Sequence, residues 1–175
     1  MVWNNLATND VVEKTAAAIR GKGLEVIIVE TKKQALEKIL ELIPAGAEIA
    51  NGSSATLQEI GFIDYLKAGE HKWKNLHAEI LKEPDGQKQM SLRRKSVSAE
   101  YFLGSVNAIA ESGELVACDA TGSRVSAYPF AAGRLVLVAG IQKIVPTLND
   151  AITRIKEYVF PLENARAQKA YGSPS

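Results

Sequence analysis

The sequence has very little of the chemistry that disulfides and metal centres need. Its 175 residues include one cysteine, Cys118, and two histidines. One cysteine excludes an internal disulfide, and also an iron–sulfur cluster or cysteine-rich zinc site built by this chain alone. His71 and His77 are poorly spaced for a metal pair on one helical face. We therefore expect no metal site, no resident cofactor and a reducing, cytoplasmic environment.

Excess charge and long apolar runs are also absent. Lys and Arg total 21 against 20 Asp and Glu, a net charge of +1, so no global field attracts nucleic acid or an anionic membrane. No apolar run approaches the roughly 20 residues that span a bilayer, and the first residues lack a signal-peptide core. The composition, 46% hydrophobic and 23% charged, is that of a soluble globular protein. We expect a single domain over residues 1–175, with residues 163–175 a flexible tail.

Strand and helix patterns alternate along the chain. The segment Leu24–Val29 contains the β-branched run Val-Ile-Ile-Val, which predicts a strand buried on both faces. Thr31 and Gln34 predict a capping box at the start of a helix, and Asp10 and Glu13 predict another. Further strands are expected at 47–50, 115–118 and 135–139. Further helices are expected at 55–60, before a helix end near 93–95, and from Thr147. The alternation predicts an α/β fold in which helices cover both faces of a mostly parallel central sheet.

Small polar residues follow the strand expected at 47–50. Asn51, Gly52, Ser53 and Ser54 join that strand to a helix, and the amides and dipole of a first helical turn favour an anion. The loop is not a Walker loop, because no Gly-Lys-Ser/Thr follows at the required spacing. A capped turn is the competing interpretation.

Charged and small residues in Ser105–Pro146 form the second half of the predicted site. Glu111 is a candidate acid/base or covalent nucleophile, against the alternative of a solvated turn carboxylate. Lys143 is the second catalytic candidate, facing a ligand anion, unless it is a helix-end cation. Arg124 either clamps the same anion or pairs with Asp119. The remaining ligand-binding candidates are Asn107, Ser112, Gly113, Asp119, Gly122 and Gly140.

Two other chemistries are disfavoured. Cys118 lies in an apolar stretch without a nearby histidine, which predicts a buried, inert thiol. A Ser-His-Asp hydrolase lacks both its G-x-S-x-G elbow and a histidine near the strand ends. The basic cluster Arg93–Lys95 is typical of a solvated helix end.

Four blocks of the sequence resemble one family. NGSSATLQEIG from Asn51, SVNAIAESGELV from Ser105, D-x-x-G-S-R from Asp119 and VLVAGIQKIVPTLNDAITRI from Val136 resemble the LUD (lactate utilization) domain family. The resemblance covers residues 10–171 and departs from the family pattern at Ser123 and Gln142, where asparagine is usual. It implies the NagB/RpiA/CoA-transferase-like fold, a three-layer α/β sandwich with a ligand cleft at the carboxyl edge of its sheet.

The same resemblance implies a link to lactate utilization, in which some members act beside iron–sulfur and oxidoreductase partners. The expected function is binding of a small anionic metabolite, a hydroxy or keto acid or a phosphorylated compound. One alternative is a non-catalytic accessory subunit of an iron–sulfur or flavin oxidoreductase complex. Another is a sugar-phosphate or acyl-CoA enzyme of the broader fold. No nucleic-acid or membrane partner is expected, and a homo-oligomer is left open.

Overall fold

The computed structural model describes residues 2–172 and residue 174. The chain divides into two compact units. Unit 1 consists of Met1–Ile28, Val106–Ala120 and Ala139–Ser175, and unit 2 consists of Val29–Ser105 and Thr121–Val138. The single domain expected over residues 1–175 stays a prediction.

Unit 2 is built on a four-stranded sheet with the order β2-β1-β3-β6. Its strands are β1 (Glu48–Asn51), β2 (Lys74–Asn75), β3 (Tyr101–Gly104) and β6 (Arg134–Leu137). All three strand pairs are parallel. Every residue of β3 is buried, as expected for a strand covered on both faces. The predicted parallel sheet is therefore confirmed.

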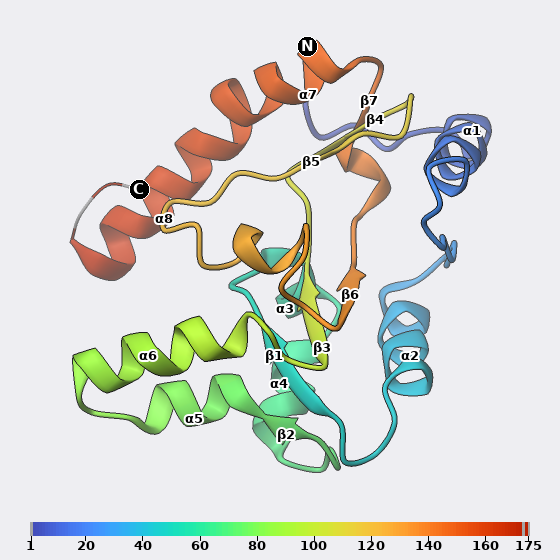
Figure 1. The fold of residues 1–175 in the computed structure, drawn as a ribbon. Helices are drawn as coiled ribbons and strands as arrows, with labels where there is room; N and C mark the ends of the chain where they lie inside the picture. Colours follow the sequence, from blue (N-terminus) through green and yellow to red (C-terminus); the bar gives the residue numbers. More distant parts are fainter. Residues whose placement is uncertain (1, 173, 175) are drawn as a thin grey trace. The chain divides into compact units, whose positions relative to one another are not determined.

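Helices cover both faces of this sheet (Figure 1). On one face, α2 (Lys32–Leu42), α3 (Ala55–Glu59) and α4 (Phe62–Ala68) pack against Ile49 and Leu103. On the other, α5 (Leu76–Lys82) packs against Ala50 and Phe102, and α6 (Gly86–Ser96) packs on α5. Because side chains alternate along a strand, Ile49 and Ala50 point into different layers. The result is the predicted three-layer α/β arrangement.

Unit 1 contains a smaller, mixed sheet with the order β5-β4-β7. β4 (Ala108–Ala110) and β5 (Leu115–Val116) form an antiparallel hairpin, and β7 (Ile144–Val145) runs parallel to β4. A short 3₁₀ helix, Ile141–Lys143, precedes β7. Helix α1 (Asn9–Arg20) also belongs to this unit.

The last helical region of unit 1 has three parts. α7 (Leu148–Arg154) passes into a π-helix, Ile155–Val159, and then into α8 (Phe160–Tyr171). Pro161 lies in the first turn of α8. A proline ring clashes with the carbonyl four residues earlier in an α-helix, and the wider turn of the π-helix lies at that place. Residues 163–171, expected in a flexible tail, are part of α8.

Three helix starts were predicted from capping residues, and two of these predictions are correct. Thr31 with Gln34 and Thr147 with Asp150 form complete capping boxes. The box expected from Asp10 and Glu13 is wrong, because α1 begins at Asn9 with Thr8 as an N-cap that makes no side-chain bond. Asp10 instead lies in the first turn, where a carboxylate favours the helix dipole.

The strand predicted at Leu24–Val29 is also wrong. These residues form neither strand nor helix, and Leu24, Ile27 and Ile28 are 49%, 43% and 40% exposed. An apolar run predicts a strand only where another strand completes its hydrogen bonds, and none pairs with it among residues 2–172.

In the same described part of the chain, no helix has the length and apolarity needed to cross a membrane.

Candidate functional site

The Asn51–Ser54 loop leaves the carboxyl edge of the unit 2 sheet, where ligands of parallel α/β sheets usually bind. The Gly52 amide donates to the Leu103 carbonyl at 3.1 Å and so fixes the start of the loop on the neighbouring strand. The Ser54 hydroxyl accepts from the Leu57 amide at 3.3 Å and caps α3. Its side chain is therefore the helix cap of the competing interpretation, and a role in ligand binding stays a prediction.

Arg124 approaches this loop from another part of unit 2. A Cβ atom on Gly52 would lie 2.6 Å from Arg124 Cγ and 2.7 Å from Cδ, so only glycine fits beneath the arginine stem. Arg124 Nη1 donates to the Ser53 carbonyl at 3.2 Å. The structure therefore brings Gly52, Ser53 and Arg124 together, and it places a cation beside the loop.

Asn51 adds a buried polar group at the same strand end. Its side chain is only 6% exposed, and Nδ2 donates to the Gly52 carbonyl at 3.4 Å. Its Oδ1 atom is buried and has no hydrogen-bond partner among the described residues. A buried acceptor without a partner costs free energy until a donor reaches it. In the predicted loop, Asn51 thus has a buried acceptor atom that a ligand donor could bind.

Three further polar residues lie at this edge and were not predicted from the sequence: Thr56, Ser105 and Tyr128. Ser105 follows β3, and its hydroxyl donates to Thr56 Oγ1 at 3.4 Å. The Tyr128 hydroxyl donates to the Ser105 carbonyl at 2.9 Å and accepts from the Ser105 amide at 3.2 Å. A side chain on Gly104 would overlap that hydroxyl. Only the position of Ser105 directly after a buried strand gave a signal in the sequence.

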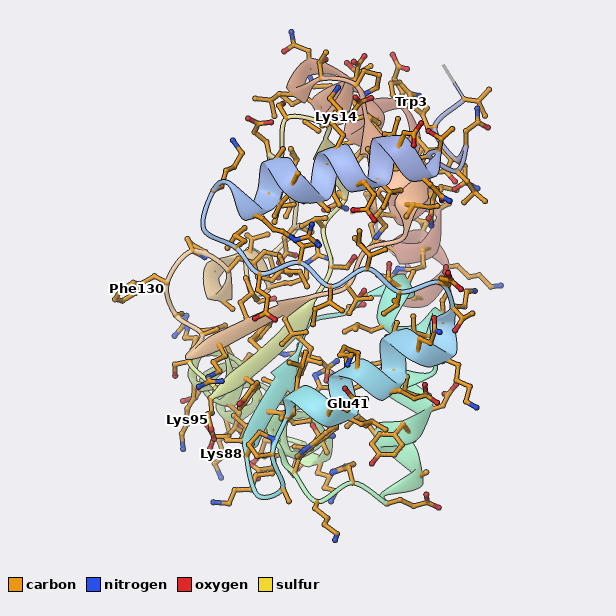
Figure 2. The ribbon with its side chains drawn as sticks, turned by 90° about the vertical axis from the view of Figure 1, so that its right-hand side faces the viewer. Trp3, Lys14, Glu41, Lys88, Lys95 and Phe130 are labelled. Atoms are coloured by element: carbon orange, nitrogen blue, oxygen red, sulfur yellow. The ribbon has the colours of Figure 1, made fainter. Side chains whose placement is uncertain are left out.

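Glu111 lies in unit 1, at the carboxyl end of β4, in the turn that leads to β5. Its Oε2 atom is 2.9 Å from Lys14 Nζ on α1, and the two side chains are 22% and 69% exposed. Figure 2 shows the position of Lys14 on α1. Glu111 therefore already has a cationic partner, which a ligand would have to share or displace.

Gly113 explains why this turn lies so close to α1. Its φ of 92° is left-handed, and a Cβ atom there would lie 2.9 Å from the Ala18 carbonyl carbon. Its neighbour Ser112 donates its hydroxyl to the Glu114 carboxylate, and this bond, more than the nearby Lys22, lowers the pKa of Glu114. The conformational freedom predicted for Gly113 is confirmed, and it serves packing against protein.

Lys143 does not come close to Glu111. It precedes β7, whereas Glu111 follows β4, and the two strands are parallel with Ala110 opposite Val145. Glu111 is therefore three residues further along the strand direction, about 10 Å. Lys143 Nζ donates to the Val106 carbonyl at 2.9 Å. Unit 1 thus separates the two predicted catalytic side chains.

Asn107 is held by local bonds of the kind expected in the alternative interpretation. Its Oδ1 accepts from the Cys118 amide at 2.8 Å, which joins the two ends of the β4–β5 hairpin. Cys118 itself is exposed, so the predicted burial of its thiol is wrong. The reason is that β5 ends at Val116, two residues earlier than expected, and the chain leaves the sheet before Cys118.

Arg154 is the buried charge that the sequence did not reveal. It is 3% exposed, Nε donates to the Trp3 carbonyl at 3.1 Å, and Nη1 donates to the Asn107 carbonyl. Its guanidinium carbon lies 5.1 Å from the centre of the Tyr158 ring. Burial lowers the pKa of Arg154, while Tyr158 opposes that shift. Arg154 therefore holds the backbone of Asn107 in place.

The remaining predicted residues are turn and loop positions. Asp119 is half-buried in the loop after β5. Gly122 has a left-handed φ of 73° before a short 3₁₀ helix, Val125–Ala127. Gly140 has a φ of −78°, which any residue adopts, but a side chain there would overlap Gln142. Within the described ranges, no group of three or more His, Cys, Asp or Glu residues is arranged to hold a metal ion.

A family model for the LUD domain matches residues 12–172. The chain belongs to the LUD domain family. The match confirms the sequence resemblance, and its range includes every predicted site residue from Asn51 to Lys143. Membership of the LUD family supports a role related to lactate utilization. A search of curated proteins found no match.

Proposed function

We propose that this LUD-domain protein binds a small anionic metabolite at the carboxyl edge of the unit 2 sheet. The ligand is a hydroxy or keto acid or a phosphorylated compound. The observation that supports the proposal most is the position of Arg124, whose stem covers Gly52 and whose Nη1 lies 3.2 Å from the Ser53 carbonyl oxygen. A guanidinium group binds carboxylate or phosphate through paired hydrogen bonds.

The proposal gives the loop residues distinct roles. Arg124 supplies the counter-charge, and the exposed Ser53 lies beside it. Asn51 Oδ1 is an acceptor for a hydroxyl or other donor of the ligand, which would complete its hydrogen bonding. The proposed catalytic roles of Glu111 as acid/base and of Lys143 as a second cation are independent of the role of Arg124. Both side chains already have a partner within unit 1.

The test compares two arginines of unit 2. Thermal unfolding of wild type, Arg124→Ala and Arg134→Ala is measured with L-lactate, pyruvate and inorganic phosphate. Arg134 is the control because it begins β6 at the amino edge of the sheet and contacts the Tyr101 ring, 5.7 Å from its centre. We expect at least one probe to stabilise wild type and Arg134→Ala, and Arg124→Ala to need at least about tenfold more ligand for the same shift. Equal stabilisation of all three proteins contradicts the site.

Glu111→Gln and Lys143→Ala test these catalytic roles. If both variants are stabilised by ligand as strongly as wild type, the two residues have no role in binding. That result leaves the role of Arg124 intact, because the two parts depend on different side chains. Turnover by the purified protein with a sugar phosphate or acyl-CoA would instead favour an enzyme of the broader fold.

An accessory role in an oxidoreductase complex is a second candidate, and the charges of α6 favour it. Within residues 2–172, no ion pair involves its cations Lys88, Arg93, Arg94 and Lys95, whereas Lys32, Lys33 and Lys38 of α2 each pair with a glutamate. Figure 2 labels two of these cations, Lys88 and Lys95. Co-purification of an iron–sulfur or flavin protein from native extract, lost on reversal of these charges, would support this role.

A cytoplasmic location is part of the proposal, since one cysteine suits a reducing compartment. Fractionation of native cells checks it. Recovery of the protein outside the cytoplasmic fraction would contradict the location without affecting the ligand site.

A further inference from the structure

Asn51 and Asn75 end two neighbouring parallel strands of unit 2, β1 and β2 (Figure 1). Asn75 Oδ1 accepts from the Ala78 amide at 3.2 Å and so caps α5. The helix that follows β1 is capped by Ser54 instead. The side chain of Asn51 therefore takes no part in capping a helix, although its position in the sheet resembles that of Asn75.

The side-chain carbonyl oxygen of Asn51 lacks a partner among the described residues. Nδ2 donates to the Gly52 carbonyl at 3.4 Å, and only the N–H end of the amide can do so, which sets the orientation of the side chain. Oδ1 is thus the atom left over, in a residue that is 6% exposed. A buried acceptor in this state costs free energy, and only an O–H or N–H group removes that cost.

The donor that suits Oδ1 is a hydroxyl group of the ligand. Carboxylate, keto and fully ionised phosphate oxygens only accept hydrogen bonds, so none of them pairs with Oδ1. Arg124, the counter-charge of the proposed site, lies over Gly52 and donates to the Ser53 carbonyl, within two residues of Asn51. The acid group and the hydroxyl are therefore expected close together in one small ligand.

We propose that Asn51 makes the unit 2 site selective for a ligand that carries a hydroxyl group near its acid group, against the corresponding keto compound. A keto oxygen would face Oδ1 as a second acceptor and leave the buried oxygen unpaired. A buried water is the competing donor, and it would serve both compounds alike. The inference rests on the proposed ligand site and decides between the hydroxy and keto compounds that the site alone leaves open.

The test measures thermal unfolding of wild type, Asn51→Leu, Asn75→Leu and Arg124→Ala over a concentration series of matched ligands. D- and L-lactate are compared with pyruvate, and glycerol 3-phosphate is compared with dihydroxyacetone phosphate. The members of each set differ only in a hydroxyl or a keto group at one carbon. Leucine keeps the approximate size of asparagine and removes the acceptor. Asn75→Leu is the control, because it makes the same change at the end of the neighbouring strand.

We expect at least one hydroxy compound to stabilise wild type and Asn75→Leu at a concentration at least about tenfold lower than its keto counterpart. In Asn51→Leu the two compounds should differ by less than about twofold. Without ligand, Asn51→Leu should unfold within about 2 °C of wild type, because no paired acceptor is lost. Asn75→Leu should unfold about 2–4 °C lower, because α5 loses its cap.

Different results overturn the inference and the ligand site. The inference fails if wild type binds hydroxy and keto compounds equally, or if the preference survives in Asn51→Leu. It also fails if ligand-free Asn51→Leu loses as much stability as Asn75→Leu, since Oδ1 would then have a structural role. In these cases the site itself stands, provided that Arg124→Ala still weakens binding. No stabilisation of wild type by any of these compounds overturns the site and the inference together.

Discussion

The two units differ in where the polar residues beside their buried strands lie. In unit 2, Asn51 ends β1 and Ser105 follows the parallel strand β3, so they lie at one edge of the sheet, where Arg124 also contacts the loop. In unit 1, Glu111 follows β4 while Lys143 precedes the parallel strand β7, so they lie at opposite ends. A polar residue beside a strand indicates a shared site only if its partner is at the same end of a parallel neighbour.

The difference extends to what the polar groups contact. Glu111 has Lys14, and Lys143 has the Val106 carbonyl, so both take part in bonds that hold unit 1 together. Asn51 Oδ1 in unit 2 has no such partner within the described chain. The buried acceptor that lacks a partner among the described residues is therefore at the carboxyl edge of the unit 2 sheet.

The largest expected effect is a loss of folding stability in the core of unit 2. Phe62 is fully buried between α4 and the sheet, and Phe62→Ala should lower the free energy of unfolding by about 3–5 kcal/mol. Val145→Ala in the smaller core of unit 1 should cost about 1–2 kcal/mol. Urea unfolding of both variants measures the difference. Equal losses would remove the contrast between the two cores.

A second comparison uses one glycine from each unit. Gly113→Ala in unit 1 combines a left-handed φ with a Cβ atom 2.9 Å from Ala18 backbone, and should cost about 2–3 kcal/mol. Gly122→Ala in unit 2 has a similar φ but open space around the Cβ atom, and should cost about 1 kcal/mol. Thermal unfolding distinguishes them. A smaller loss for Gly113→Ala would mean that α1 moves away from the turn.

Near neutral pH, an effect on stability is expected in unit 2, at His77 on α5. Burial lowers the pKa of His77 below its ordinary value of 6.5, and the charge of Arg93 lowers it further. The unfolded chain therefore binds a proton before the folded one does, so stability falls as pH drops below about 6.5. His77→Gln should make stability less dependent on pH in this range, as measured by unfolding between pH 5 and 8. An unchanged pH profile would show that His77 is not responsible.

The smallest effect is expected at the Lys14–Glu111 pair of unit 1. Because Lys14 is 69% exposed, a double-mutant cycle with Lys14→Ala and Glu111→Gln should give a coupling energy below about 1 kcal/mol. The coupling should decrease in high salt. A coupling energy of several kcal/mol would show that Glu111 is a structural residue and would weaken its role as an acid/base.

Features that depend on neighbouring residues could be predicted from the sequence. The Thr31 and Thr147 caps, strand β1 and the loop after it involve contacts within a few residues, so their patterns are visible in the chain. The three-layer fold was predicted from the sequence blocks that resemble the LUD family, together with these local patterns.

Features that depend on distant residues could not be predicted in this way. Lys14 is 97 positions from Glu111, and Arg124 is 71 positions from Ser53, and nothing near either residue marks its partner. The Leu24–Val29 prediction failed for the same reason, because apolarity is local but a strand partner is not. Tyr128 was missed because the space over Gly104 exists only in the folded chain.

The π-helix at Ile155–Val159 has a consequence for changes in chain length. Each residue added to or removed from a helix turns everything beyond it by about 100°. The wider π-turn accommodates about one extra residue within a single turn, so deleting one residue here would restore an α-turn and leave the side chains of α8 facing nearly the same way relative to α7. The π-turn should therefore tolerate the loss of one residue better than the α-helical parts of α7 and α8, where the same deletion turns every following side chain by about 100°.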